Sequence, residues 1–135
     1  MFMEQQNYSV EFEPYTNRHF IKKFRKKHAE KWPPTELAIN DACARIDNML
    51  QYSRADVISV SGHNQLVKLD FAIYGTQTSP KTSGNRCILF VDNNARLVRI
   101  LLVYSKDDIS EPNETQKWKS IVKNAYNEIA GIFNL

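Results

Sequence analysis

Two cationic residues flank a pair of apolar segments in the second half of the chain. Arg86 comes directly before the apolar run of residues 87–91, and Lys106 follows a second apolar segment, residues 97–104. The polar turn Asp92-Asn93-Asn94 separates these segments, so the pattern predicts two neighbouring antiparallel strands. In such a pair the start of one strand lies beside the end of the next. We therefore expect Arg86 and Lys106 to face one concave patch, where cations held by a sheet would suit a phosphate group.

The elements that would position these cations are indicated by hydrophobic periodicity. Alternating apolar and polar side chains, or an unbroken apolar run, predict strands at residues 8–13, 56–61, 66–73, 87–91 and 95–104, of which 56–61 is the weakest. Apolar side chains at helical spacing predict helices over residues 17–31, 35–52 and 113–132. Thr35 and Asn113 are the expected helix caps, and Gln116 stands three residues after Asn113 as in a capping box.

The order of these elements defines the expected fold class. A strand is followed by two helices, three or four strands and a last helix, and strands joined by short turns imply an antiparallel sheet. We expect an α+β fold in which residues 1–135 form one domain. It would consist of a small antiparallel sheet with an N-terminal strand, a helical hairpin on one face and a C-terminal helix. Hydrophobic residues make up 42% of the chain, which is enough for such a core.

Composition argues against several classes of protein. The net charge of +3 is too small to indicate nucleic-acid binding by itself. Residues 18–31 are rich in cations. This basic helix is either a solvated face or a docking surface, whose partner would be a phosphate or an acidic protein.

Cys43, Cys87 and the histidines lack metal-ligand spacing, so we expect free core thiols, no metal and no cofactor. The sequence has no signal-peptide pattern and no bilayer-length apolar segment, which favours a cytoplasmic protein.

Four short motifs follow one another along the chain. They are Phe20-Ile21-Lys22-Lys23-Phe24, Leu66-Val67-Lys68-Leu69-Asp70-Phe71, Ser83-Gly84-Asn85-Arg86 and Leu101-Leu102-Val103-Tyr104-Ser105-Lys106. The first is similar to an "F-x-K-x-L" helix, the second to a first strand after a helical hairpin, the third to an "S-G-Y-R" motif that opens a strand, and the fourth to a strand ending in basic residues. Together, over roughly residues 8–126, they resemble the RelE/ParE superfamily of bacterial toxins, which includes the HigB group.

This resemblance implies a toxin of a type II toxin–antitoxin system. RelE-type and HigB-type toxins are ribosome-dependent endoribonucleases that cleave messenger RNA in the ribosomal A site, need no metal and are silenced by an antitoxin. The implied partners are the cognate antitoxin, mRNA and the ribosome, with no membrane. The implied reaction transfers the phosphodiester to the neighbouring 2′-hydroxyl. That reaction requires removal of the 2′-proton, stabilisation of a charged phosphorane and protonation of the leaving 5′-oxygen.

The resemblance also implies roles for individual residues. Arg86 would be the guanidinium that grips the phosphorane, and Lys106 the cation that follows the strand. Lys81 lies in the loop before Arg86, where the family places lysines, and is a third catalytic candidate. The candidate RNA contacts are Lys68, His63 and Tyr104. The simpler interpretation of these lysines is that they are exposed surface residues, and of His63 that it is an idle turn residue.

Some features depart from the nuclease pattern. Gln77 and Ser79 stand where the family usually has lysines or arginines, and the acids Asp107 and Asp108 follow Lys106 directly. Two alternatives therefore stay open. One is a non-enzymatic inhibitor of a protein target such as DNA gyrase, as the ParE branch would suggest. The other is a non-toxic interaction protein on the same fold.

Overall fold

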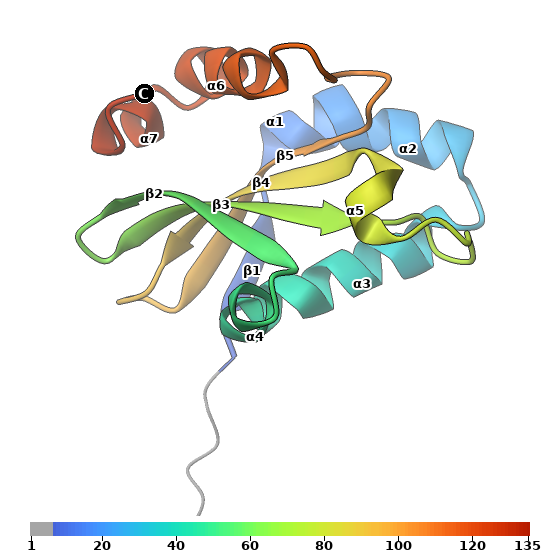
Figure 1. Cartoon of the computed structure of the whole chain (residues 1–135), viewed down its shortest axis with the longest axis horizontal. Helices are drawn as coiled ribbons and strands as arrows, with labels where there is room; N and C mark the ends of the chain where they lie inside the picture. Colours follow the sequence, from blue (N-terminus) through green and yellow to red (C-terminus); the bar gives the residue numbers. More distant parts are fainter. Residues whose placement is uncertain (1–6) are drawn as a thin grey trace, which may run out of the picture.

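A computed structural model describes residues 7–135 and places a five-stranded sheet between two layers of helices (Figure 1). The strands are β1 (Ser9–Phe12), β2 (Ala55–Ser61), β3 (Asn64–Phe71), β4 (Asn85–Asp92) and β5 (Leu97–Tyr104). The helices are α1 (Pro14–Thr16), the π-helical η1 (Asn17–Ile21), α2 (Lys22–Lys27), α3 (Trp32–Ala44), α4 (Ile46–Gln51), α5 (Pro80–Ser83), α6 (Glu114–Ala125) and α7 (Asn127–Ile132). The mixed α+β fold expected from the sequence is confirmed.

The strand order across the sheet is β1-β5-β4-β3-β2. Strands β2 to β5 pair with their sequence neighbours in antiparallel fashion, because short connections join them. β1 instead pairs with β5 in parallel, from Ser9 opposite Leu97 to Phe12 opposite Ile100. The sheet is therefore mixed at this edge, whereas the sequence predicts an antiparallel sheet. β1 and β5 are not joined by a turn, because the helices from α1 to α4 carry the chain from β1 to β2 at the opposite edge of the sheet.

Helices cover both faces of the sheet. In Figure 1, α3 and α4 lie on one side of the strands, and α6 and α7 lie on the other. The central strand β4 contributes to both cores: Cys87, Leu89 and Val91 join the cluster that includes α3, whereas Ile88 and Phe90 join the cluster that includes α6. This alternation follows from the two-residue period of a strand. The unbroken apolar run of residues 87–91 is thus a strand buried on both faces.

Side chains from α1 and from the junction of α6 and α7 cover the part of β5 that extends beyond β1. β1 pairs with β5 only as far as Ile100, and the next polar backbone groups of β5 bind side chains. The Val103 N–H donates to Oγ1 of the fully buried Thr16 at 2.9 Å, and the Tyr126 hydroxyl donates to the Leu101 carbonyl at 2.7 Å. These contacts satisfy strand-edge groups that would otherwise be buried without partners.

Helix ends differ from the expectations at several places. The first helical segment begins at Pro14 and ends at Lys27, and the second is broken at Arg45. α3 begins at Trp32 rather than at a cap on Thr35, because prolines 33 and 34 fit the first helical turn, where no backbone N–H is needed. The Thr35 hydroxyl donates instead to the Lys31 carbonyl at 2.7 Å. Asn113 precedes α6 in a left-handed conformation and makes no side-chain capping bond. The last helix is broken at Tyr126 into α6 and α7.

Candidate functional site

Arg86 lies on β4 between two carboxylates of the same face of the sheet. Its cross-strand neighbours are Asp70 on β3 and Tyr104 on β5. The Arg86 Nε lies 3.0 Å from the Asp70 Oδ1 and 3.9 Å from the Glu114 Oε2 at the start of α6. The guanidinium also donates to the carbonyls of Asn85 and Lys81. Only 16% of the Arg86 side chain is exposed, and the two carboxylates oppose its charge inside the protein.

Tyr104 belongs to the same buried network. The residue is fully buried, and its hydroxyl donates to the Glu114 Oε2 at 2.8 Å. Burial, then the hydrogen bond and charge of Glu114, raises the pKa of the Tyr104 phenol far above its ordinary value. The sequence predicts that Tyr104 contacts RNA, but the structure puts it in the core because its strand passes beneath α6. Arg86, Asp70, Tyr104 and Glu114 together tie α6 to the sheet, and we call them the α6 anchor.

Lys106 lies at an open cavity of about 310 Å³ between α2 and the segment that follows β5. The chemically active side chains that line this cavity are Lys23, Lys27, His28, Ser83, Asn85, Ser105, Lys106, Asp107 and Asp108. Arg86 is not among the lining residues, although its neighbour Asn85 is. Successive residues of a strand point to opposite faces, so Asn85 faces the cavity while Arg86 faces α6. The expected convergence of Arg86 and Lys106 on one patch is therefore not what the structure has.

Charges in the cavity are only partly compensated. Lys23 pairs with Asp108 at 3.0 Å, and Lys27 pairs with Asp107 at 3.1 Å. Across residues 7–135 the ammonium of Lys106 has no carboxylate partner. Three lysines thus face two carboxylates, and the surplus cation is Lys106. The cavity holds an uncompensated positive charge that is open to solvent.

The turn before β4 sets the position of Lys106. Gly84 has a φ of +78°, and a Cβ built on it would lie only 2.8 Å from the Lys106 Cβ. The aliphatic stem of Lys106 therefore lies directly on the glycine backbone. The Ser83 hydroxyl lies 2.6 Å from the Phe71 carbonyl and accepts from the Asn85 N–H at 3.0 Å, which holds the turn on the end of β3. The Ser83-Gly84-Asn85 motif is thus a support for Lys106 rather than only the approach to Arg86.

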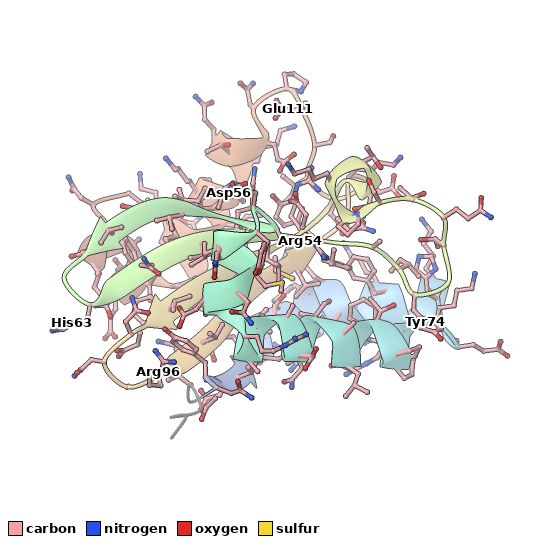
Figure 2. All side chains as sticks on the ribbon, turned by 60° about the horizontal axis from the view of Figure 1, so that its bottom comes forward. Arg54, Asp56, His63, Tyr74, Arg96 and Glu111 are labelled. Carbon is pink, nitrogen blue, oxygen red and sulfur yellow. The ribbon has the colours of Figure 1, made fainter. Side chains whose placement is uncertain are left out.

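The other predicted site residues do not gather at the cavity. Lys81 is exposed on α5, and Lys68 is half-buried on β3, on the same face as Asp70. His63 lies in the β2–β3 turn, and Figure 2 shows it at the tip of that hairpin. β3 runs from this turn to Phe71, which pairs with Asn85, so His63 and the cavity lie at opposite ends of an eight-residue strand, roughly 23 Å apart.

His28, Lys23 and Lys27 are site residues that sequence reasoning does not assign. The helical pattern places His28 on the buried face of the first helix and the lysines on its solvated face. One signal is present, because Lys23 and Lys27 are four residues apart and share a side of the helix. Their partners Asp107 and Asp108 lie about eighty residues away, and no local pattern links the two segments.

No protein-family model and no curated protein matches the sequence. The structure resembles a chain in the crystal structure of the archaeal RelE–RelB complex from Pyrococcus horikoshii OT3, with a TM-score of 0.51. The two chains are 12% identical, and the match covers 74% of this chain and 96% of that chain. The fold is therefore RelE-like, as the sequence motifs indicate.

Three further observations concern metal ions, the cysteines and membrane-spanning helices. Within residues 7–135, no cluster of histidine, cysteine, aspartate and glutamate side chains could hold a metal ion. Both cysteines are free thiols in the core, and burial raises the pKa of each. No helix in this part of the chain combines the length and hydrophobicity needed to span a bilayer.

Proposed function

We propose that this chain is the toxin of a type II toxin–antitoxin system and that it cleaves translated messenger RNA in the cytoplasm. The observation that carries the proposal is the solvent-open cavity on a RelE-like fold, with Lys106 as its uncompensated cation. An ammonium whose stem lies on Gly84, beside two further lysines, supplies the positive charge that a phosphorane requires. The sequence suggests that Lys106 and Arg86 both contact the phosphate. In this proposal Lys106 makes that contact without Arg86.

Energetics favour the Lys106 cavity over Arg86 as the contact for a phosphate. Freeing Arg86 for a ligand would leave Asp70 and Glu114 as buried charges, and breaking such a pair costs about 3–5 kcal/mol. The Lys27–Asp107 pair is about two-thirds exposed on both sides, and opening such a pair costs about 0–1 kcal/mol. A phosphate can therefore displace Asp107 from Lys27, but not the carboxylates from Arg86. The role of Arg86 is instead to tie α6 to the sheet as part of the α6 anchor.

A cognate antitoxin is the proposed protein partner, and the ribosome with its mRNA is the proposed target. The solved structure that this chain resembles is itself a RelE–RelB complex. An apolar patch on the outer side of α3, formed by Pro34, Leu37 and Tyr74, offers such a partner a surface. Leu37 is 71% exposed and Tyr74 is 63% exposed, which is unusual for side chains of this size.

A second function is favoured by the burial of Arg86 between two carboxylates. Because the α6 anchor occupies the arginine that the nuclease family would use, the chain could act without catalysis, as an inhibitor of a protein target such as DNA gyrase. Under this alternative the cavity serves as a contact surface and Lys106 has no catalytic role. The two functions differ in which nucleic acid is broken when the protein is expressed.

Controlled expression in bacteria tests both. The nuclease predicts growth arrest with cleaved messages, and Lys106→Gln should relieve the arrest while keeping the stem on Gly84. Lys26→Gln, an exposed substitution on α2 outside the cavity, is the matched control and should remain toxic. Arrest with intact messages and broken DNA would support the inhibitor instead. Absence of arrest at verified expression would refute both and leave the non-toxic interaction protein.

A further inference from the structure

His28 is the one imidazole of the cavity wall among the described residues, and three hydrogen bonds hold its backbone. Its N–H donates to the Phe24 carbonyl at 2.7 Å, and its own carbonyl accepts from the N–H groups of Lys31 and Trp32 at 3.1 and 2.7 Å. Its ring stacks on Phe24, which in turn stacks on the buried Trp32. The Phe24 ring thus borders the imidazole, and His28 also lines the cavity.

The imidazole has both of its nitrogens available. In residues 7–135 neither ring nitrogen has a hydrogen-bond partner within the protein, although the side chain is half-buried. A histidine with a purely structural role would usually hold its tautomer through a carboxylate or carbonyl partner. A group that binds the imidazole from the cavity would therefore displace no hydrogen bond within the protein.

Burial, supported by neighbouring lysine charges, keeps His28 neutral. Lys23 and Lys27 face it from α2, Lys31 follows it in the chain, and Lys106, Asp107 and Asp108 face it from the segment after β5. Burial, followed by the charges of Lys27 and Lys31, lowers the pKa of His28 below its usual 6.5. At neutral pH the ring is therefore unprotonated, which is the form that accepts a proton.

We propose that the cavity binds the backbone of single-stranded RNA, with a phosphodiester against Lys106 and with His28 as the group that removes the 2′-hydroxyl proton. This inference rests on the proposed function and names the base that the function lacks. A 2′-hydroxyl beside a phosphodiester distinguishes RNA from DNA, so a base that acts on this hydroxyl can cleave RNA alone.

The chemical step balances without any co-reactant. The 2′-proton moves to a nitrogen of His28, the 2′-oxygen forms a bond to phosphorus, and the phosphorus–O5′ bond breaks. The leaving 5′-oxygen takes a proton from a lysine ammonium of the cavity wall, while Lys106 stabilises the charge on the phosphorane. The products are a 2′,3′-cyclic phosphate and a 5′-hydroxyl. His28 then returns its proton to solvent, and the lysine regains one.

Binding is tested first, with an RNA hexanucleotide whose 2′-hydroxyls are replaced by fluorine, which keeps the RNA-like sugar but cannot attack the phosphate. Added to the full-length protein, it should raise the pKa of His28 followed by NMR, because the bound phosphate stabilises the imidazolium. Lys106→Gln should weaken its binding by about tenfold or more, since one charge-assisted contact is lost. Lys26→Gln should bind normally. A His28 titration that the oligonucleotide leaves unchanged would overturn the RNA site.

Catalysis is tested in an in vitro translation reaction with a defined message. His28→Gln should slow cleavage by about 10²–10⁴-fold while it binds the unreactive hexanucleotide as the parent does. Added imidazole should restore part of the activity of His28→Ala, which a structural defect would not allow. Full activity of His28→Gln, or equal loss of binding and cleavage, would overturn the assignment of the base.

The two proposals can fail separately. If the wild-type protein cleaves no message, the proposed function and the base role of His28 both fail. Binding that still raises the pKa of His28 and still depends on Lys106 would then preserve the cavity as an RNA-binding site. If cleavage occurs but neither His28 nor Lys106 contributes, the function stands and this inference fails.

Discussion

The aliphatic stem of Lys106 rests on the backbone of Gly84, so that a Cβ at Gly84 would lie 2.8 Å from the Lys106 Cβ and 3.1 Å from its Cδ. Glycine is required here for two reasons. Its φ of +78° is disfavoured for residues with a side chain, and the space that a Cβ would occupy is filled. The turn that opens β4 therefore determines where the cation that follows β5 can stand.

Gly84→Ala is expected to lower stability and to impair the cavity. The left-handed backbone alone should cost about 1–2 kcal/mol, and the new Cβ should also push Lys106 away from its position. Gly75→Ala is a matched control, because Gly75 has a φ of +79° but no neighbouring atom within 4 Å of the place where a Cβ would stand. Urea unfolding should show a loss for both variants that is larger for Gly84→Ala, whereas oligonucleotide binding should fall only for Gly84→Ala. Equal binding by both would show that Gly84 does not position Lys106.

The pair formed by Arg86 and Asp70 should be structural. Arg86→Ala leaves Asp70 and Glu114, each with only 13% of its side chain exposed, without their cation. We expect the free energy of unfolding to fall by about 3 kcal/mol or more, and a double-mutant cycle with Asp70→Ala should show strong coupling. Arg45→Ala breaks the exposed pair with Asp41 and should cost about 0–1 kcal/mol. A stable Arg86→Ala protein that has lost RNA cleavage would instead make Arg86 catalytic.

The bond between Thr16 and β5 provides a test of how the sheet edge is closed. Thr16→Val keeps the shape of the side chain but leaves the buried Val103 N–H without its acceptor. The loss should be about 1–3 kcal/mol, measured by urea unfolding, together with faster hydrogen exchange at the Val103 amide. Thr16→Ser retains the hydroxyl and should keep the Val103 amide protected. Similar exchange in both variants would mean that the hydroxyl is not the acceptor.

The lowered pKa of His28 predicts a pH dependence of stability. Between the folded pKa and the unfolded value of 6.5, the unfolded chain binds more protons than the folded protein. Stability should therefore decrease as the pH falls from 6.5 through the folded pKa of His28. His28→Gln should remove this part of the dependence, so the difference between the two unfolding curves at pH 7 and pH 5 isolates it. Parallel curves for the two proteins would contradict the direction of the shift.

The apolar pattern of the sequence is sufficient to predict most of the fold. Alternation at Val67, Leu69 and Phe71, and the continuous apolar run of residues 87–91, indicate a half-buried and a fully buried strand, and both are confirmed. The reason is that burial on one face or on two leaves a local periodicity that survives in a single sequence. Helix ends are less predictable. The Thr35 hydroxyl binds the Lys31 carbonyl and the distant Tyr74 N–H, and Asn113 takes a left-handed backbone that a capping rule does not consider.

The role of each cation was decided by the tertiary structure. The sequence by itself determined that Arg86 and Lys106 stand near the same end of two paired strands, and Arg86 does lie opposite Tyr104, close before Lys106. It did not determine which face each side chain takes or which carboxylates would meet it. Asp70 reaches Arg86 through the register of β3, and Glu114 reaches it through the docking of α6. Such contacts join segments far apart in the chain, so only the packed sheet and helices place one cation in the core and leave the other open to a ligand.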